Sequence, residues 1–291
     1  MGIPRGLDNG VGWVRSRLAT ALRDRVAGPD GPAIASRIWD SPGERWFTES
    51  DPIWQVHADA AMFVGGLRAL LLQSLHPLAM AGVAAHSGYK GDPWGRLQRT
   101  SHFLATTTYG TVADAEAMIT RIRRIHGKVS GTAPDGRPYA ASDPHLLTWV
   151  HIAEIDSFLA AYQRLSRDPL SDSDADRYVA QTAVIAGRLG VPTPPTTVRE
   201  LHRAIAGYRT ELRGTQEARD AARFLLLTPP LPLAARPGYA ALAGAAVALL
   251  PGWARRPLRL PHLPLTERVV NLPVGDAATA LIRWAMAAPA A

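Results

Sequence analysis

Apolar residues recur at every third or fourth position along most of this chain, which is the spacing of amphipathic helices. In the segment 12–26, four apolar residues stand four apart with arginines between them: Val14, Leu18, Leu22 and Val26. The same periodicity predicts further helices over 172–189, 197–212, 217–227 and 239–250. The alternation of apolar and polar residues that marks a half-buried strand is not found. The pattern therefore predicts one all-α domain.

The long apolar run at residues 57–85 is interrupted by Arg68, His76 and Pro77. These interruptions argue against a membrane-spanning helix. Because proline removes an intrahelical hydrogen bond, we predict two buried helices that are broken at His76–Pro77. The later apolar run at 239–250 is too short to cross a bilayer.

Capping residues define the helices in the middle of the chain. Asp92 and Pro93 suit the N-cap and the first position of a helix that runs to about Tyr109. Thr111 and Asp114 have the spacing of a capping box. We expect the helix that they open to end near Gly131, a turn with a possible small hairpin at 132–141, a helix from 142–144 to about Arg167, and irregular structure around Pro32, Pro42 and Pro52.

The composition narrows the possible chemistry. The 291 residues are 47% hydrophobic and 20% charged, which is typical of a folded globular protein. Because cysteine is absent, disulfides, cysteine-bound Fe–S clusters, zinc fingers and thiolate-bound haem are excluded, so a metal would be held by His, Asp or Glu. The net charge is +7, but the arginines are dispersed and no nucleic-acid motif is present, so no nucleic acid is expected as a partner. The N-terminal segment lacks the apolar core of a signal peptide, and we expect a cytoplasmic location.

The first candidate functional group is a polar helical turn. Arg96, Arg99 and Thr100 stand at i, i+3 and i+4 and share one face of a helix. Two cations and a hydroxyl on one turn can hold an anionic ligand or hydrogen-bond dioxygen. An ordinary helix surface has the same spacing, and from spacing alone it is the more frequent explanation.

Histidines are the second group of candidates. His126 lies in step with Ile119 and Ile122 on the apolar side of its helix, where a neutral imidazole can bind iron. A core histidine with one hydrogen bond is the commoner alternative. His76 and His86 are ten residues apart, which does not place two ligands on one helix face, so we interpret them as structural or pocket-lining.

A third helix contains a histidine and a carboxylate, His151 and Glu154, three residues apart. Di-iron bundles use this spacing, but with glutamate before histidine and in two copies. Structural hydrogen bonding by Glu154 or Asp156 is therefore favoured. The signatures G-x-S-x-G, H-E-x-x-H and G-x-G-x-x-G are absent, which argues against common hydrolases, zinc proteases and dinucleotide-binding enzymes.

Several segments taken together resemble one family. They read HPLAMAGVAAHS, DPWGRLQRTSHF, YGT, RIRRIHGKVSG, GRPYAASDPHLLTWVH, ARFLLLTPP and LLPGWARRPL. In this order and spacing they resemble the actinobacterial MpaB-type oxygenases, whose catalytic domain is similar to that of the latex clearing proteins, the rubber oxygenases. The likeness extends from about Trp46 to Pro261.

The resemblance implies a globin-like multi-helix fold that carries haem (heme b, with its iron). It matches His126 to the proximal iron ligand of the latex clearing proteins, and Arg96 and Thr100 to a distal Arg-x-x-Lys-Thr element. Arg99 stands where that element has lysine, and arginine is a poor iron ligand because it stays protonated. An open or water-bound distal site is therefore implied, with His151 as a possible neighbour of the haem.

The activity implied by the resemblance is that of a haem-dependent dioxygenase-type enzyme. Dioxygen would attack an unsaturated apolar substrate, isoprenoid or lipid-like, held between helices, and the carbon–carbon bond would be cleaved to carbonyl products. Arg96 and Thr100 would orient the oxygen or anchor a propionate. The alternative is a haem or lipid binding protein without turnover.

Two further expectations concern organisation and partners. We expect an N-terminal helix and connector over 1–45, a catalytic domain over 46–261 and an extension over 262–291. The basic and aromatic stretch Tyr239–Arg259 is a candidate for peripheral membrane contact.

Overall fold

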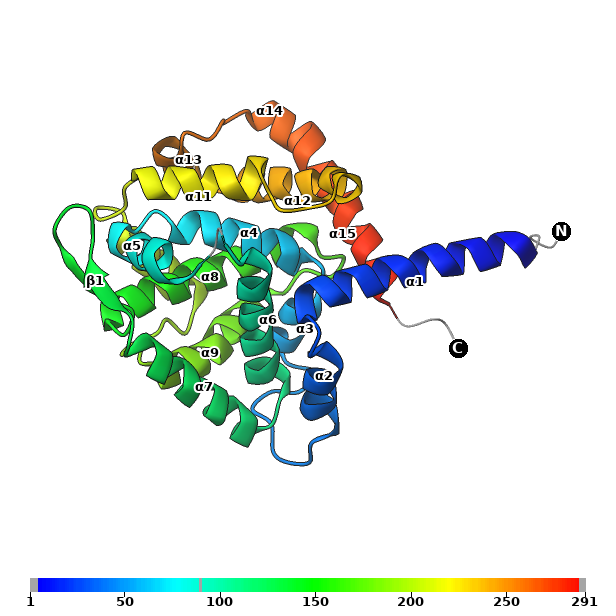
Figure 1. Ribbon diagram of the computed structural model, residues 1–291, viewed down its shortest axis with the longest axis horizontal. Helices are drawn as coiled ribbons and strands as arrows, with labels where there is room; N and C mark the ends of the chain where they lie inside the picture. The colour runs from blue at the N-terminus through cyan, green and yellow to red at the C-terminus, as the bar shows by residue number, and fades with distance from the viewer. Residues whose placement is uncertain (1–4, 89–90, 288–291) are drawn as a thin grey trace.

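The computed structural model describes residues 5–88 and 91–287, and their regular structure is almost entirely helical (Figure 1). The exception is an antiparallel hairpin of β1 (Ser130–Thr132) and β2 (Pro138–Ala140). The helices are α1 (Arg5–Ala27), α2 (Gly31–Asp40), α3 (Pro52–Ala58), α4 (Ala61–Gln73), α5 (Pro77–His86), α6 (Pro93–Tyr109), α7 (Val112–His126), α8 (Pro144–Leu165), α9 (Asp172–Leu189), α10 (Val198–Tyr208), α11 (Gln216–Leu227), the 3-10 turn η1 (Leu233–Ala235), α12 (Arg236–Leu249), α13 (Gly252–Leu258), α14 (Pro264–Thr266), the π-helical η2 (Glu267–Asn271) and α15 (Leu272–Met286). The predicted all-α single domain is confirmed.

The helix starts predicted from capping residues are found. Asp92 Oδ1 accepts a hydrogen bond from the Gly95 N–H at 2.9 Å, and Thr111 Oγ1 accepts one from the Asp114 N–H at 3.2 Å. Each bond satisfies an N–H group that has no partner inside the helix. The predicted hairpin is also present. It begins at Ser130. The preceding helix α7 ends at His126, five residues before the predicted end near Gly131.

The expectation of irregular structure around Pro32 and Pro52 is wrong, because these prolines lie in the first turns of α2 and α3. Proline is well tolerated there, since the N–H that it lacks would have no helical partner. The predicted break at His76–Pro77 is confirmed. It separates α4 from α5, and the two helices meet at 109°.

The core is built around the crossing of α4 and α8. Trp149 of α8 is fully buried, and its Nε1 donates to the Gln73 carbonyl at 3.1 Å, while Gln73 Nε2 donates to the Val150 carbonyl at 3.1 Å. At Gly65 the helices approach so closely that a Cβ atom would lie 3.1 Å from the Phe158 Cα. This crossing fixes α8, which carries four of the polar residues discussed below.

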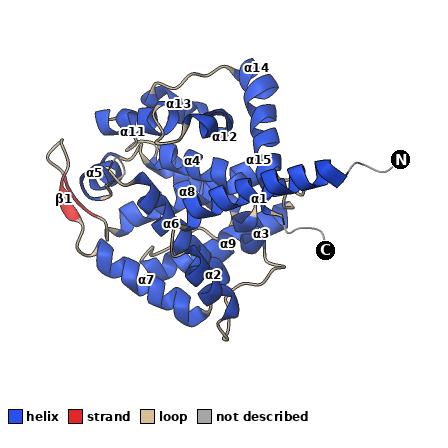
Figure 2. Ribbon diagram, turned by 45° about the vertical axis from the view of Figure 1, so that its right-hand side comes forward, coloured by secondary structure: helices blue, strands red, loops and turns tan. Residues whose placement is uncertain are grey.

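The remaining helices surround this pair. Helices α6 and α7 are joined by a short connection and diverge from it in Figure 1. Helix α6 packs on α3, and α7 packs on α9. Among the described residues, neither α6 nor α7 packs closely on α8. Figure 2 shows α1 projecting from the body near α15, and the hairpin, in red, at the edge away from the termini.

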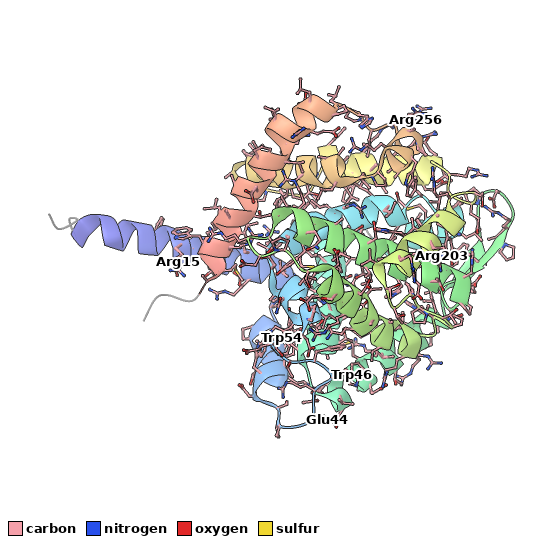
Figure 3. All side chains as sticks on the ribbon, turned by 180° about the vertical axis from the view of Figure 1, so that it is seen from behind. Arg15, Glu44, Trp46, Trp54, Arg203 and Arg256 are labelled. Atoms are coloured by element: carbon pink, nitrogen blue, oxygen red, sulfur yellow. The ribbon has the colours of Figure 1, made fainter. Side chains whose placement is uncertain are left out.

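The basic stretch Tyr239–Arg259 is only partly at the surface. Arg255 is 4% exposed and forms a 2.5 Å ion pair with Glu267, so it is not available to a membrane. Arg256 is exposed and lies at the periphery of the molecule (Figure 3). No single described helix has the length and apolar character to cross a membrane. Two bent pairs of helices, α4 with α5 and the segment 233–249 with α13, have the necessary length and apolar character only when the two members of a pair are taken together.

Candidate functional site

The three polar residues of the predicted helical turn lie near the start of α6 but point in different directions. Arg96 is half-buried, and its Nη1 donates to Ser87 Oγ at the end of α5, at 2.8 Å. Arg99 is exposed and forms a 3.2 Å ion pair with Asp92. Thr100 is exposed, and its Oγ1 donates to the Arg96 carbonyl at 3.1 Å. Of the three residues, only Arg96 is partly buried in this structure.

His126 is the last residue of α7 and shares its inner face with the buried Ile119, as the periodicity predicts. Its Nδ1 is buried and has no hydrogen-bond partner among the described residues. Burial lowers the pKa of His126, so the ring is neutral at neutral pH. Buried polar atoms without partners are uncommon in folded proteins and call for an explanation.

His151 and Glu154 lie one turn apart on α8. Burial lowers the pKa of His151 to about 4 and raises the pKa of Glu154 to about 7. The Nε2 of His151 is buried without a partner. The structural bonding considered for Asp156 is found, because this carboxylate forms a 2.7 Å ion pair with Arg68.

His57 of α3 is the centre of an internal hydrogen-bond network that sequence reasoning missed. Its Nδ1 lies 2.8 Å from Thr108 Oγ1 and its Nε2 lies 3.3 Å from the Tyr178 hydroxyl. Burial lowers the pKa of His57 to about 3 and raises that of Tyr178 well above its ordinary value. The partners come from α6 and α9, so the local sequence around His57 gives no sign of them.

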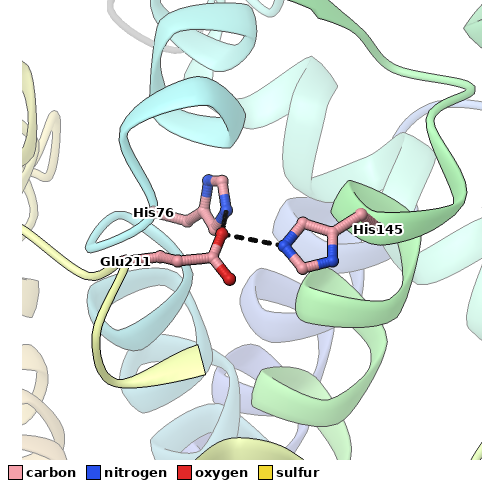
Figure 4. Close-up of side chains that lie close together, drawn as sticks. All are labelled: His76, His145 and Glu211. Atoms are coloured by element: carbon pink, nitrogen blue, oxygen red, sulfur yellow. Dashed lines mark hydrogen bonds and ion pairs between the residues drawn. The ribbon is translucent and has the colours of Figure 1, made fainter. Parts of the chain in front are cut away.

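A second group of polar residues brings together His76, His145 and Glu211 (Figure 4). His76 precedes α5, His145 is in the first turn of α8, and Glu211 follows α10. Their ligand atoms all lie within 4.8 Å of one another. Glu211 Oε2 is 2.8 Å from His145 Nε2 and 3.5 Å from His76 Nε2.

The environment of this group is asymmetric. The His76 side chain is 2% exposed, whereas those of His145 and Glu211 are 50% and 40% exposed. Burial lowers the pKa of His76 despite the nearby carboxylate. Burial acts to raise the pKa of Glu211, but the hydrogen bond and charge of His145 outweigh it, and the pKa is lowered.

This group cannot be predicted from the sequence, because its members are far apart in the chain. The fold brings them together, with His76 at the bend before α5. His76 was interpreted as structural or pocket-lining, and the structure places it in a possible metal site. His86 has a structural contact, since its Nε2 lies 3.1 Å from the Tyr139 hydroxyl.

Comparison with known families identifies the family of this chain. A family model described as ER-bound oxygenase mpaB/B'/Rubber oxygenase, catalytic domain, matches residues 54–284. Comparisons with curated proteins and with solved structures gave no significant match. The matched region extends from α3 to α15 and contains every candidate residue described above. The chain therefore belongs to the oxygenase family that includes mpaB/B' and the rubber oxygenases.

Proposed function

We propose that this protein is a haem-dependent oxygenase that acts on an unsaturated apolar substrate. Its family supports the reaction class. The observation that carries the haem assignment is His126, a neutral imidazole at the end of α7 with a buried Nδ1 that no described residue satisfies.

The residues present fit a haem group. A neutral imidazole is the form that binds iron, and His126 is in that form because burial lowers its pKa. Arg96 adds a half-buried cation on α6 that suits a propionate. When bound, haem would supply the redox chemistry by which dioxygen oxidises an alkene.

A space for an apolar ligand is supported by the partial exposure of several residues of the protein interior. His151 and Glu154 are strongly desolvated, yet part of each side chain remains accessible, as is typical of residues that border an internal hollow. Apolar residues of α5, α6 and α8 in the main core are also only partly buried: Val83, Phe103, Leu104 and Val150. Ligand pockets are mostly apolar with a few polar anchors.

The roles of the chain's own residues follow from their positions. His126 would hold the cofactor, and His151, neutral above about pH 4, would line the site without adding charge. Ser87 accepts a hydrogen bond from Arg96 and so orients its guanidinium. We assign the distal role first to Arg96. Arg99 and Thr100 stay predictions from the resemblance, and to act they must turn away from solvent.

The test is an ultraviolet–visible spectrum of the purified protein, as isolated and after dithionite and carbon monoxide. We expect a Soret band that shifts with carbon monoxide, that His126→Ala abolishes, and that a substitution of the exposed His262 (His262→Ala) leaves intact. Circular dichroism checks that the variant is still helical. A protein that cannot be reconstituted with haem, or full haem occupancy in His126→Ala, contradicts the assignment.

A haem or lipid carrier without turnover is the alternative function. Oxygen consumption on addition of an alkene separates it from an oxygenase. We further propose that a peripheral contact with anionic lipid is made by the exposed Arg256 and Arg259 next to Leu263 and Leu265, apolar residues that are 56% and 76% exposed. Exposed apolar residues flanked by cations are typical of interfacial segments.

A further inference from the structure

We propose that His76, His145 and Glu211 form a second site, which binds a divalent first-row transition-metal ion. None of these three residues is proposed above to hold haem, and the proposal does not depend on the assignment of His126. Two imidazoles and one carboxylate are a recurrent ligand set for zinc and for non-haem iron(II), and three protein ligands leave positions open for water or another molecule.

The strongest argument is the hydrogen-bond geometry around His145. The hydroxyl of Tyr208 donates its proton to the His145 carbonyl at 2.8 Å, because a carbonyl can only accept. The same hydroxyl lies 3.1 Å from His145 Nδ1, and because its only proton is already used, it accepts a hydrogen bond from the Nδ1–H group. In a neutral ring the lone pair is then on Nε2, which lies 2.8 Å from the Glu211 carboxylate. Two lone pairs at this distance repel unless a positive species, a proton or a metal ion, lies between them.

His76 gives an independent indication of an occupant. Its side chain is 2% exposed, and its buried Nε2 has only a long contact with Glu211 Oε2, at 3.5 Å, and no closer hydrogen-bond partner among the described residues. A proton shared by His145 and Glu211 leaves this nitrogen with the long contact alone, whereas a metal ion between the three side chains satisfies all of them. The Ala79 N–H contacts His76 Nδ1 at 3.4 Å, the long limit of a hydrogen bond, and metal binding through Nε2 exchanges this weak contact for a metal bond.

The geometry needs only a small adjustment. Ligands that are about 2.1 Å from a metal lie roughly 3.0–3.5 Å from one another in tetrahedral or octahedral sites. Both carboxylate–imidazole separations, 2.8 and 3.5 Å, are close to this spacing. The imidazole nitrogens lie within 4.8 Å of each other, so the half-exposed His145 ring needs to move by only about 1 Å.

The neighbouring residues orient the ligands. The His145 and Tyr208 rings stack with centroids 4.5 Å apart, and the Tyr208 hydroxyl holds the tautomer that directs the His145 lone pair at the site. Tyr208 is therefore a positioning residue, as is typical of partners that accept the second N–H of a metal-binding histidine. The first turns of α5 and α8 bring positive dipole ends toward the ion, so the charge of Glu211 is required to offset them.

Zinc(II) is the probe, added to the full-length protein after dialysis against a chelator that removes a three-ligand ion but leaves haem in place. We expect one zinc per chain by titration calorimetry, and a zinc-edge X-ray absorption spectrum with two imidazoles and oxygen ligands. This spectrum is element-specific, so haem iron does not contribute to it. Because removal of the buried His76 also perturbs folding, the test relies on His145→Ala and Glu211→Gln, which should abolish binding.

Two further variants make the test specific. Tyr208→Phe should weaken zinc binding by about 10–100-fold while keeping the same ligand set. His86→Ala, a nearby histidine outside the group, should bind zinc normally. Absence of zinc binding by the wild-type protein, or equal binding by Glu211→Gln, overturns the proposal and identifies the group as a proton-sharing structural network.

Discussion

Glu154 should make the protein less stable as the pH rises. This carboxyl lies inside the protein on α8 and forms no hydrogen bond with the described residues, and burial raises its pKa to about 7 from an ordinary 4.5. The folded protein therefore binds more protons than the unfolded chain between these two pH values. Its free energy of unfolding falls as the pH rises through that window.

The magnitude follows from the pKa difference. An increase from 4.5 to about 7 corresponds to roughly 3 kcal/mol of stability that is present in acid and lost above the folded pKa. Glu154→Gln is neutral at every pH and so removes this loss. Because the Gln amide also needs hydrogen bonds when buried, we expect the variant to be about 1–3 kcal/mol more stable than the wild type at about pH 8, and nearly equal to it at about pH 5.

Urea unfolding followed by circular dichroism at these two pH values measures the difference between the variant and the wild type. All other titrating groups are shared, so their contributions cancel. Glu49→Gln, which changes an exposed carboxyl, is the control and should give the same small difference at both pH values. If the effect of Glu154→Gln is also independent of pH, Glu154 ionises normally in the folded protein and the reasoning is wrong.

Two more predictions concern packing and surface charge. Gly65→Ala should cost about 1–3 kcal/mol, because its Cβ would meet the Phe158 backbone at 3.1 Å. Gly66→Ala has open space and should gain up to about 1 kcal/mol from helix propensity, so equal unfolding midpoints for the two variants refute the close packing. Arg256→Glu should reduce co-sedimentation with anionic liposomes, whereas the same charge change at the exposed Arg203 (Figure 3) should not, and equal losses would indicate attraction by net charge alone.

The fold could be predicted where the determining interactions are local. Asp92 and Thr111 cap helices through bonds to residues three positions ahead, so their roles can be inferred from the sequence. The helix over 172–189, which the apolar periodicity predicts, has these same bounds in the structure. Pro32 was misinterpreted because proline marks both the first turn of a helix and a break, and the local sequence does not distinguish them.

The candidate site was less predictable because its members come together through tertiary structure. Periodicity placed His126 on the inner face of α7, but the lack of a partner for its Nδ1 depends on side chains from elsewhere in the chain. Arg255 and Arg256 are neighbours in one basic stretch. Arg255 is buried in an ion pair with Glu267, twelve residues later, and of the two only Arg256 is exposed. The roles assigned from the family resemblance stay predictions until the haem spectrum is measured.

The geometry of α8 makes the two proposed sites separable by experiment. His145 and His151 are six residues apart on this helix. At 1.5 Å and 100° per residue they lie about 9 Å apart along the axis and point in directions that differ by about 120°. One metal centre cannot use both histidines from a regular helix. Because the two proposals use different ligands, His145→Ala should abolish zinc binding and leave the Soret band unchanged, while His126→Ala should do the reverse. If one substitution removes both signals although the helical circular dichroism is retained, the residues belong to a single centre and the division into two sites is wrong.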